Sequence, residues 1–271
     1  MLGFGGIVVM DESPEEADRV VSKAVDAGIN YFDVAPSYGN AEDVLGNALK
    51  RHRDKVNLAC KTLERTAEGA RRELEQSLRL LHTDRFDVYQ LHGMPNIREL
   101  EQAMGPGGAM ESILDAQERG IIRFVGITTH FPHVALEAIR RYLFDTVMFP
   151  ISFSSWINSG FGPDVLAAAA EKEMGVLAIK AMALGRLNEG CERKWAKPWY
   201  VPADDPEIVE LALRFTLSRD VDSAIPPGEI GPFEMALSAR NITRPLDHDE
   251  EARLIALAGS LEAMFPIAPI P

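Results

Sequence analysis

Four polar side chains stand where buried strands of an α/β protein would end. Asp33 closes an apolar run within GINYFDVAPSYGN, and Tyr38 follows a few residues later. The next run, VNLACK, ends in Lys61, and the run after it, RFDVYQLH, ends in His92. A strand buried on both faces is apolar throughout. A carboxylate, a phenol, an ammonium and an imidazole at these strand ends therefore indicate a site.

These four groups suit the delivery of a proton to a carbonyl oxygen. Tyr38 is the candidate general acid, and because an unperturbed phenol has a pKa near ~10, it needs a nearby cation to make the phenolate accessible. Lys61 is that cation, Asp33 would keep it charged and oriented, and His92 would polarise or position the carbonyl. Such a site contains no reductant, so a hydride-carrying cofactor is implied.

The strands that carry these residues belong to a regular alternation of strands and helices. About eight short apolar runs recur roughly every thirty residues, the period of a strand followed by a crossover helix. We expect strands at 2–9, 30–35, 56–61, 85–92, 122–128, 145–151, 175–181 and 222–227. Amphipathic patterns predict helices after Ser13, whose neighbour Pro14 suits a first helical turn, and at 67–82, 110–120, 133–143, 164–175, 205–219 and 247–264.

This alternation predicts a single (β/α)8 barrel, one domain over residues 1–271. A doubly wound open sheet is the alternative, but it would need a helix to begin at the glycines of LGFGGIV, and no helix pattern starts there. In a barrel the carboxyl ends of the strands surround one mouth, so the four polar residues would meet there.

Two long segments, 153–163 and 186–206, are expected to be loops at the carboxyl ends of the sixth and seventh strands. Barrels build their substrate pockets from such loops. The segments contain Trp156, Trp195 and Trp199. Because exposed tryptophan is unfavourable, these side chains either form pocket walls or pin the loops to the barrel rim.

Composition excludes several function classes. A net charge of −13 argues against nucleic acid or an anionic membrane as the main partner. Cys60 and Cys191 have neither metal-ligand spacing nor a disulfide pattern, so we expect no metal and a reducing cytoplasm. The sequence shows no signal peptide and no apolar stretch long enough to span a membrane. The expected partner is a small molecule, and the oligomeric state is not predicted.

The segment GINYFDVAPSYGNAEDVLGNAL, the lysine of ACKT and the histidine of QLHGM together resemble the aldo-keto reductase family, with matching order over nearly the whole chain. The resemblance implies an NAD(P)H-dependent reductase of aldehydes or ketones. It places the family's four catalytic roles on Asp33, Tyr38, Lys61 and His92.

The resemblance also implies cofactor contacts after the fifth, sixth and seventh strands. Thr128 and Thr129 stand where the family has a Ser-Asn pair that binds the nicotinamide carboxamide, and His130 either stacks near the cofactor or caps the next helix. Phe149 stands where many members have a glutamine. Lys180 ends the seventh strand, where the family binds the cofactor pyrophosphate.

After the eighth strand, Pro227, Gly228 and Glu229 occupy the region where NADP-specific members often keep a basic residue. A carboxylate at Glu229 would instead accept a hydrogen bond from a free ribose hydroxyl, unless it is a solvated loop residue. NADP(H) is favoured by the family pattern, and NAD(H) stays open.

Three further expectations follow. The amino-terminal hairpin that closes the barrel floor in family members is expected to be missing, with the floor open or covered by FPIAPIP. A cofactor-binding regulatory subunit with little turnover is the second interpretation. A cofactor-free barrel enzyme acting on phosphate-bearing substrates is the third, and it is disfavoured because glycines are sparse around Gly185 and Gly228.

Overall fold

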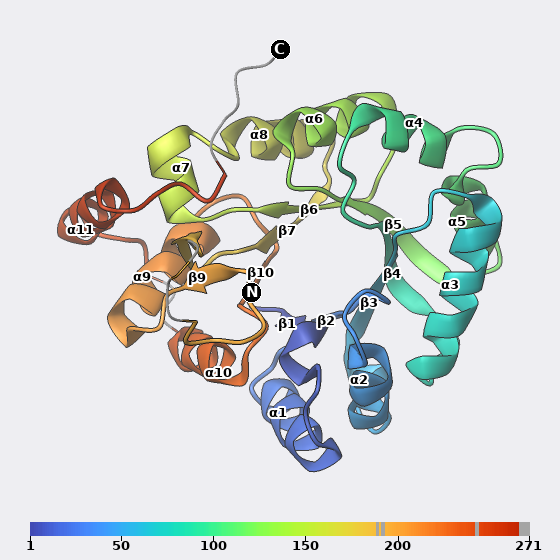
Figure 1. The fold of residues 1–271 in the computed structure, drawn as a ribbon, viewed down its shortest axis with the longest axis horizontal. Coiled ribbons are helices and arrows are strands. Elements are labelled where there is room, and N and C mark those ends of the chain that lie inside the picture. The colour runs from blue at the N-terminus through green and yellow to red at the C-terminus, as the bar shows by residue number, and fades with distance from the viewer. Residues whose placement is uncertain (188–189, 191–192, 242–243, 266–271) are drawn as a thin grey trace.

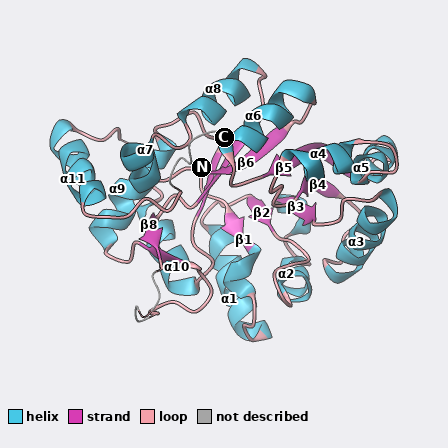
Figure 2. Cartoon of the chain, turned by 45° about the horizontal axis from the view of Figure 1, so that its top comes forward, coloured by secondary structure: helices cyan, strands magenta, loops and turns pink. Residues whose placement is uncertain are grey.

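Eight parallel strands in chain order form the centre of the computed structural model, which describes residues 1–187, 190, 193–241 and 244–265. The sheet order is β1-β2-β3-β4-β5-β6-β7-β10, and helices surround it (Figures 1 and 2). A parallel bridge between Leu2 and Ala224 brings the first strand next to the last. The predicted (β/α)8 barrel is confirmed.

The barrel strands are β1 (Phe4–Gly5), β2 (Tyr31–Asp33), β3 (Asn57–Thr62), β4 (Phe86–Leu91), β5 (Ile122–Thr128), β6 (Thr146–Pro150), β7 (Gly175–Ile179) and β10 (Ser223–Ile225). A separate antiparallel pair, β8 (Ala183–Arg186) and β9 (Tyr200–Pro202), lies within the segment after β7. An apolar cluster inside the barrel consists of Tyr31, Ala59, Val88, Met148, Leu177 and Ile225.

The helices are α1 (Pro14–Asp26), α2 (Ala41–Leu49), α3 (Ala67–Leu80), α4 (Ile97–Met104), α5 (Ala109–Glu118), α6 (Pro132–Arg141), α7 (Phe153–Ser159), α8 (Pro163–Glu171), α9 (Pro206–Leu217), α10 (Ile230–Ala239) and α11 (His248–Gly259). Two short 3-10 helices, Gly6–Val9 and Arg53–Lys55, complete the described elements. Within these residues, no helix combines the length and the apolar character needed to cross a membrane.

Two sequence-based expectations about the strands and loops were wrong. The first strand is short, because β1 pairs with β2 only at Phe4–Phe32 and Gly5–Asp33, after which the chain turns into a 3-10 helix that buries Val8 and Val9. Segment 153–163 is not a loop. Ser152 caps α7 by accepting a hydrogen bond from the Ser155 amide, and Gly160 ends it in the left-handed conformation that favours glycine.

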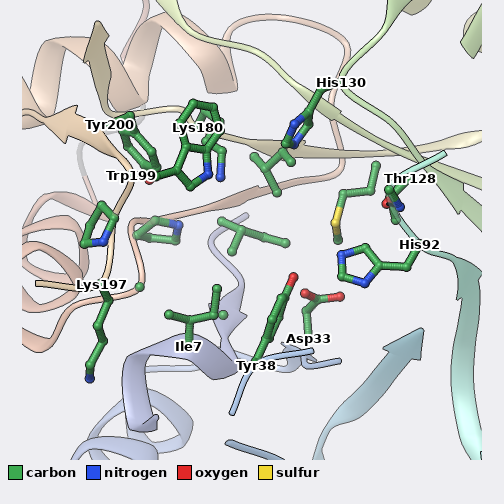
Figure 3. A pocket seen from close by; sticks show the side chains of 18 residues that line it. Ile7, Asp33, Tyr38, His92, Thr128, His130, Lys180, Lys197, Trp199 and Tyr200 are labelled. Carbon is green, nitrogen blue, oxygen red and sulfur yellow. Dashed lines mark hydrogen bonds between the residues drawn. The ribbon is translucent and has the colours of Figure 1, made fainter. Parts of the chain in front are cut away.

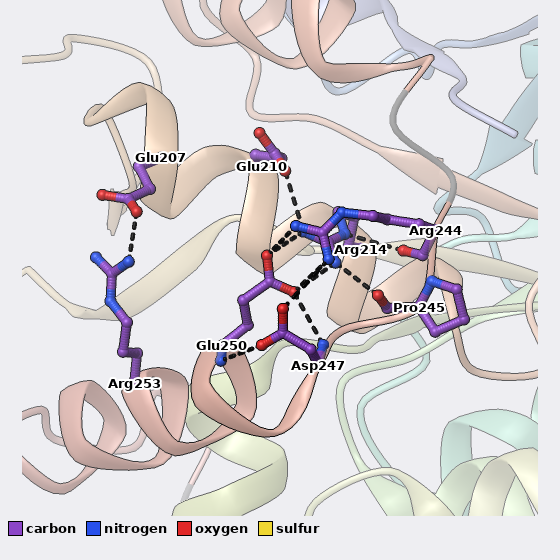
Figure 4. A network of polar contacts seen from close by, with 8 residues as sticks. All are labelled: Glu207, Glu210, Arg214, Arg244, Pro245, Asp247, Glu250 and Arg253. Atoms are coloured by element: carbon purple, nitrogen blue, oxygen red, sulfur yellow. Dashed lines mark hydrogen bonds and ion pairs between the residues drawn. The ribbon is translucent and has the colours of Figure 1, made fainter.

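An ion-pair network joins α9 to α11 (Figure 4). The buried Arg214 guanidinium binds both carboxylate oxygens of Glu250 at 2.6 and 2.9 Å and donates to the carbonyls of Arg244 and Pro245. Asp247 caps α11, and Glu250 completes the capping box. The last helix is therefore fixed to the barrel by a buried guanidinium as well as by apolar packing.

The expectation that the barrel floor lacks a hairpin and is open or covered by FPIAPIP can be compared with the structure only for the described residues. No described strand precedes β1. Phe265, the first residue of FPIAPIP, packs on His130 and Trp199, which are beyond the carboxyl ends of the strands rather than beneath the barrel. The rest of that segment, and Cys191, lie outside the described residues.

Candidate active site

Lys61 is the centre of the candidate site. It lies on β3, is fully buried, and points to the residues that end β2 and follow it. Its ammonium donates hydrogen bonds to the carboxylate of Asp33, to the carbonyl of Val34 at 3.3 Å and to the phenolic oxygen of Tyr38 at 3.4 Å. Because an ammonium has three donors, these three contacts use all of them.

The local fold explains why these residues meet. Parallel pairing places Asp33 opposite Ala59, so that Lys61, two residues further along β3, reaches the end of β2 on the same face. A turn then carries Tyr38 back over the site, with the Tyr38 amide bonded to the Ala35 carbonyl. Cys60 points the other way, as its place on the strand predicts, with its sulfur 3.5 Å from the Glu42 carboxylate.

The electrostatics of the three groups are coupled. Burial by itself would lower the pKa of Lys61, but the charge of Asp33, the phenol of Tyr38 and the hydrogen bond to Asp33 together outweigh it and raise the pKa of Lys61 to about 12. The lysine is therefore charged at neutral pH. Burial raises the pKa of Tyr38 above the ordinary value of a phenol, and Lys61 opposes this rise. The phenol thus keeps its proton while a cation stands ready to stabilise its conjugate base.

His92 faces Tyr38 from the end of β4. The two rings are nearly perpendicular, with centroids 5.7 Å apart, and Nδ1 lies 3.5 Å from the Ser37 hydroxyl. Its backbone is fixed by hydrogen bonds to Thr62 and from Arg65. Burial, reinforced by the charge of Lys61, lowers the pKa of His92 to about 2. A neutral imidazole can donate one N–H to a carbonyl oxygen without carrying a charge.

A cavity of about 270 Å³ opens beside these groups (Figure 3). The structure brings eight of the sequence-predicted site residues to its walls: Asp33, Tyr38, His92, Thr128, His130, Lys180, Trp199 and Gly228. Lys61 is not on the wall but contacts two residues that are. His130 packs at a tilt against the rings of Trp199 and Phe265 rather than capping α6, and burial lowers its pKa to about 4.

Four predicted cofactor residues lie off the cavity wall. Thr129 is engaged with the backbone of Met94 and Phe131, and Phe149 stacks on Phe161 between the barrel and the helices. Side chains alternate along a strand, so the neighbour of Phe149, Met148, faces the cavity instead.

Pro227 and Glu229 form a turn after β10. The Pro227 carbonyl accepts a hydrogen bond from the Glu229 amide at 2.9 Å. One carboxylate oxygen of Glu229 accepts the backbone N–H of Lys197 at 2.7 Å. Glu229 is therefore bound to the segment before β9 and is not a freely solvated loop residue.

The three tryptophans have different places. Trp199 lines the cavity. Trp156 lies on α7 against Phe215 and the Arg219 guanidinium, because the segment that carries it is a helix packed on α9. Trp195 packs against Gly231 at the start of α10, where an added Cβ would lie 2.7 Å from the indole ring. Both of these side chains fasten segments to the barrel.

Sequence reasoning missed several residues of the cavity wall. Met148, Ile179 and Ile225 are inward-facing positions near the ends of their strands, and strict alternation along each run was the signal that could have found them. Ile7 was assigned to a strand that does not extend so far. Lys197 and Tyr200 come from the long segment after β7, which carries no periodic signal.

Comparison with known proteins identifies the family. The sequence matches the Aldo/keto reductase family over residues 1–198. It is 25% identical to L-galactose dehydrogenase of Arabidopsis thaliana over an alignment of 280 residues, which covers 92% of this chain and 87% of that protein. It is also 25% identical to the uncharacterized oxidoreductase YqkF of Bacillus subtilis, over 68% of this chain and 61% of that protein. The chain belongs to the aldo/keto reductase family.

Solved structures have the same fold. The holo form of aldo-keto reductase AKR11C1 from Bacillus halodurans superposes with a TM-score of 0.73 at 24% identity, covering 97% of this chain and 92% of that one. An aldo-keto reductase from Klebsiella pneumoniae in complex with NADPH gives the same TM-score at 21% identity, covering 99% of this chain and 94% of that one. These structures support the fold that the resemblance implied, and the family match over residues 1–198 confirms the resemblance itself.

Proposed function

We propose that this protein reduces an aldehyde or a ketone to the alcohol with a nicotinamide cofactor, and that Tyr38 is the general acid. The observation that carries the proposal is the position of Lys61, whose ammonium hydrogen-bonds both Asp33 and Tyr38 beneath an open cavity. Relatives include an L-galactose dehydrogenase and a methylglyoxal reductase DkgA, which supports carbonyl chemistry.

The proton transfer follows from the charges of these groups. Tyr38 holds its proton until negative charge develops on the carbonyl oxygen, because burial raises the pKa of the phenol. As the proton leaves, the Lys61 ammonium stabilises the phenolate, and Asp33 keeps that ammonium in place. The neutral His92 donates an N–H to the same carbonyl oxygen and so positions it.

The cavity fits a nicotinamide. Its walls include the apolar side chains of Ile7, Met148, Ile179 and Ile225, which suit a planar ring. The Thr128 hydroxyl accepts the Gly93 amide N–H at 2.7 Å, so its own proton is available to a carboxamide oxygen. When bound, the nicotinamide supplies the hydride for the carbonyl carbon.

The turn after β10 is the proposed place for the cofactor phosphates. Pro226 and Gly228 line the cavity close to the first turn of α10, and barrels commonly bind phosphate after their seventh and eighth strands. Thr129, Phe149 and Pro227 lie off the cavity wall, so we propose that they hold the strand ends and turns around the cofactor rather than contact it. NADP(H) is the favoured cofactor, on the precedent of the Klebsiella relative. A carboxylate at Glu229 would favour NAD(H).

Initial rates of NADPH and NADH oxidation with a reactive aromatic aldehyde test this proposal. Turnover with either cofactor is expected, and the ratio of the two rates reports the effect of Glu229. Cofactor binding seen by fluorescence, without turnover of any aldehyde or ketone, would contradict the reductase and favour the regulatory binding subunit.

A further inference from the structure

Lys180 is a cation on the cavity wall that the proposed proton transfer does not use. It follows β7 in the left-handed backbone conformation, with φ 66°, which is uncommon for a residue with a side chain. Its ammonium lies 5.3 Å from the centre of the Trp199 ring and 4.8 Å from that of Tyr200. Figure 3 shows these three residues on the opposite side of the cavity from Tyr38 and Asp33.

The charged groups on the cavity wall differ in whether an oppositely charged side chain neutralises them. Asp33 is bound to Lys61, and Lys197 is bound to the Glu12 carboxylate at 2.7 Å and to the Val8 carbonyl. Lys180 has no carboxylate within ion-pair distance among the described residues and makes only the two aromatic contacts. Its charge is therefore the one on this wall that a described side chain does not neutralise.

An unpaired ammonium in such a place is energetically unfavourable. Burial, and then the charge of Lys61, lower the pKa of Lys180 to about 8. The pKa values of His92 and His130 are lowered as well, which is consistent with a cavity that contains uncompensated positive charge. Aromatic faces compensate a partly buried cation such as Lys180 only in part. An occupant that brings an anionic oxygen to this corner would restore the full charge of Lys180 and gain a charge-assisted hydrogen bond.

We propose that Lys180 binds a carboxylate of the substrate, so that the preferred substrates are aldehydes or ketones carrying a carboxylate group. This inference rests on the proposed reductase function and names its substrate class. The carbonyl oxygen would lie at Tyr38 and His92, and the carboxylate would lie across the cavity, in the corner formed by Trp199 and Tyr200.

The position of Lys180 favours the substrate over the cofactor pyrophosphate. The proposed phosphate region is the turn at Pro226 and Gly228, beside Ile7. In Figure 3, Ile7 and Lys197 lie on one side of the cavity, whereas Lys180 lies beside Trp199 and nearer to His130. The alternative partner of Lys180 is a phosphate of the cofactor, and the experiment distinguishes a substrate carboxylate from a cofactor phosphate.

The test compares two matched substrate pairs: succinic semialdehyde and 4-carboxybenzaldehyde, each with its methyl ester. For the wild type we expect the higher kcat/KM with the acids. In Lys180→Met, kcat/KM for the acids should fall by about 10- to 100-fold, the range for a lost charge-assisted contact, with the esters changed by less than about threefold. Lys180→Arg should retain most of the preference for the acids. The exposed Lys172 provides the control, Lys172→Met.

A binding measurement covers the cofactor alternative. Titration of NADPH by fluorescence should give the same Kd for the wild type and Lys180→Met. Equal losses with acid and ester, together with weaker NADPH binding, would overturn the proposal and assign Lys180 to the cofactor phosphates. Circular dichroism and the unfolding temperature must match the wild type for either result to count.

A second readout separates this proposal from the reductase function. Calorimetry measures the binding of 4-carboxybenzyl alcohol and of its methyl ester without any turnover. If the wild type reduces no aldehyde but binds the acid more tightly than the ester, and Lys180→Met removes this difference, the carboxylate site is supported and the reductase function is refuted. If the wild type reduces aldehydes but neither rates nor binding distinguish acid from ester, the reductase stands and the carboxylate site is refuted.

Discussion

The ammonium nitrogen of Lys61 lies 3.4 Å from the phenolic oxygen of Tyr38 and 5.0 Å from the centre of its ring. The cation is thus aimed at the oxygen that must carry negative charge after proton transfer. Because Lys61 is fully buried and is held by Asp33, little reorganisation is needed when that charge appears.

Removing the Lys61 ammonium should lower the catalytic rate, and a second variant can distinguish this loss from a loss of folding stability. Lys61→Met should lower kcat/KM by about 10²- to 10⁴-fold, the range for a lost proton-transfer contribution. It should also destabilise the fold, because the buried Asp33 carboxylate loses its partner. The double variant Asp33→Asn, Lys61→Met should recover the unfolding temperature without recovering activity. Recovery of both would mean that the pair is only structural.

The neutral state of His92 predicts a particular pH dependence. Because its pKa is lowered to about 2, the imidazole does not titrate between pH 5 and 8. The profile of kcat/KM should therefore show no inflection near the ordinary histidine value of ~6.5 that depends on His92. An inflection there that disappears in His92→Gln would contradict the assigned charge state.

In the turn after β10, Gly228 has no room for a side chain. A Cβ placed at Gly228 would lie 2.4 Å from Cγ2 and 2.6 Å from Cβ of Ile7. Gly228→Ala should therefore shift this wall and weaken NADPH binding by about tenfold, equivalent to overpacking of ~1.4 kcal/mol. Adding Ile7→Gly, which removes both of these carbons, should recover part of the lost binding. Gly259→Ala, where nothing lies within 4 Å, is the control. Unchanged binding in Gly228→Ala would place the cofactor elsewhere.

The ion pair between α9 and α11, which is remote from the cavity, should contribute more to the free energy of unfolding than an exposed ion pair does. Arg214→Met leaves the Glu250 carboxylate without its buried partner and should cost about 3 kcal/mol of unfolding free energy. The exposed pair of Arg253 and Glu207 is the comparison, and Arg253→Met should hardly change the denaturation midpoint. Equal effects of the two substitutions in urea denaturation would refute this account.

The same contact has a predicted pH dependence. Arg214 and Arg244 hold the pKa of Glu250 well below its usual range. Its contribution is therefore present above the unfolded value of about 4.3 and is lost as the pH falls below it. The wild type should lose more stability than Arg214→Met between neutral pH and pH 3, and parallel losses would contradict the assignment.

The sequence predicted the barrel and the four central residues because both depend on local signals. Apolar runs that alternate with helical patterns define the strands, and Asp33, Lys61 and His92 interrupt those runs at their ends. Parallel register then brings the ends together without any further information.

The cavity wall was harder to predict because it depends on packing between distant segments. Phe149 and Met148 are both apolar, so composition could not tell which one faces inward. The helix α10 was missed because Gly231 and Pro232 occupy its first turn and weaken the helical pattern. Tyr200 and Lys197 reach the cavity through a segment whose path is set by contacts with Glu12 and Glu229.

The most direct test of the central claim is the steady-state rate of NADPH oxidation by Tyr38→Phe with a reactive aldehyde. This account predicts a loss of at least ~100-fold in kcat with the Kd for NADPH unchanged, because only the proton donor is removed. Tyr142→Phe, the same change at the tyrosine that follows the last residue of α6, should leave both quantities unaltered. Turnover by Tyr38→Phe at the wild-type rate would show that another group delivers the proton.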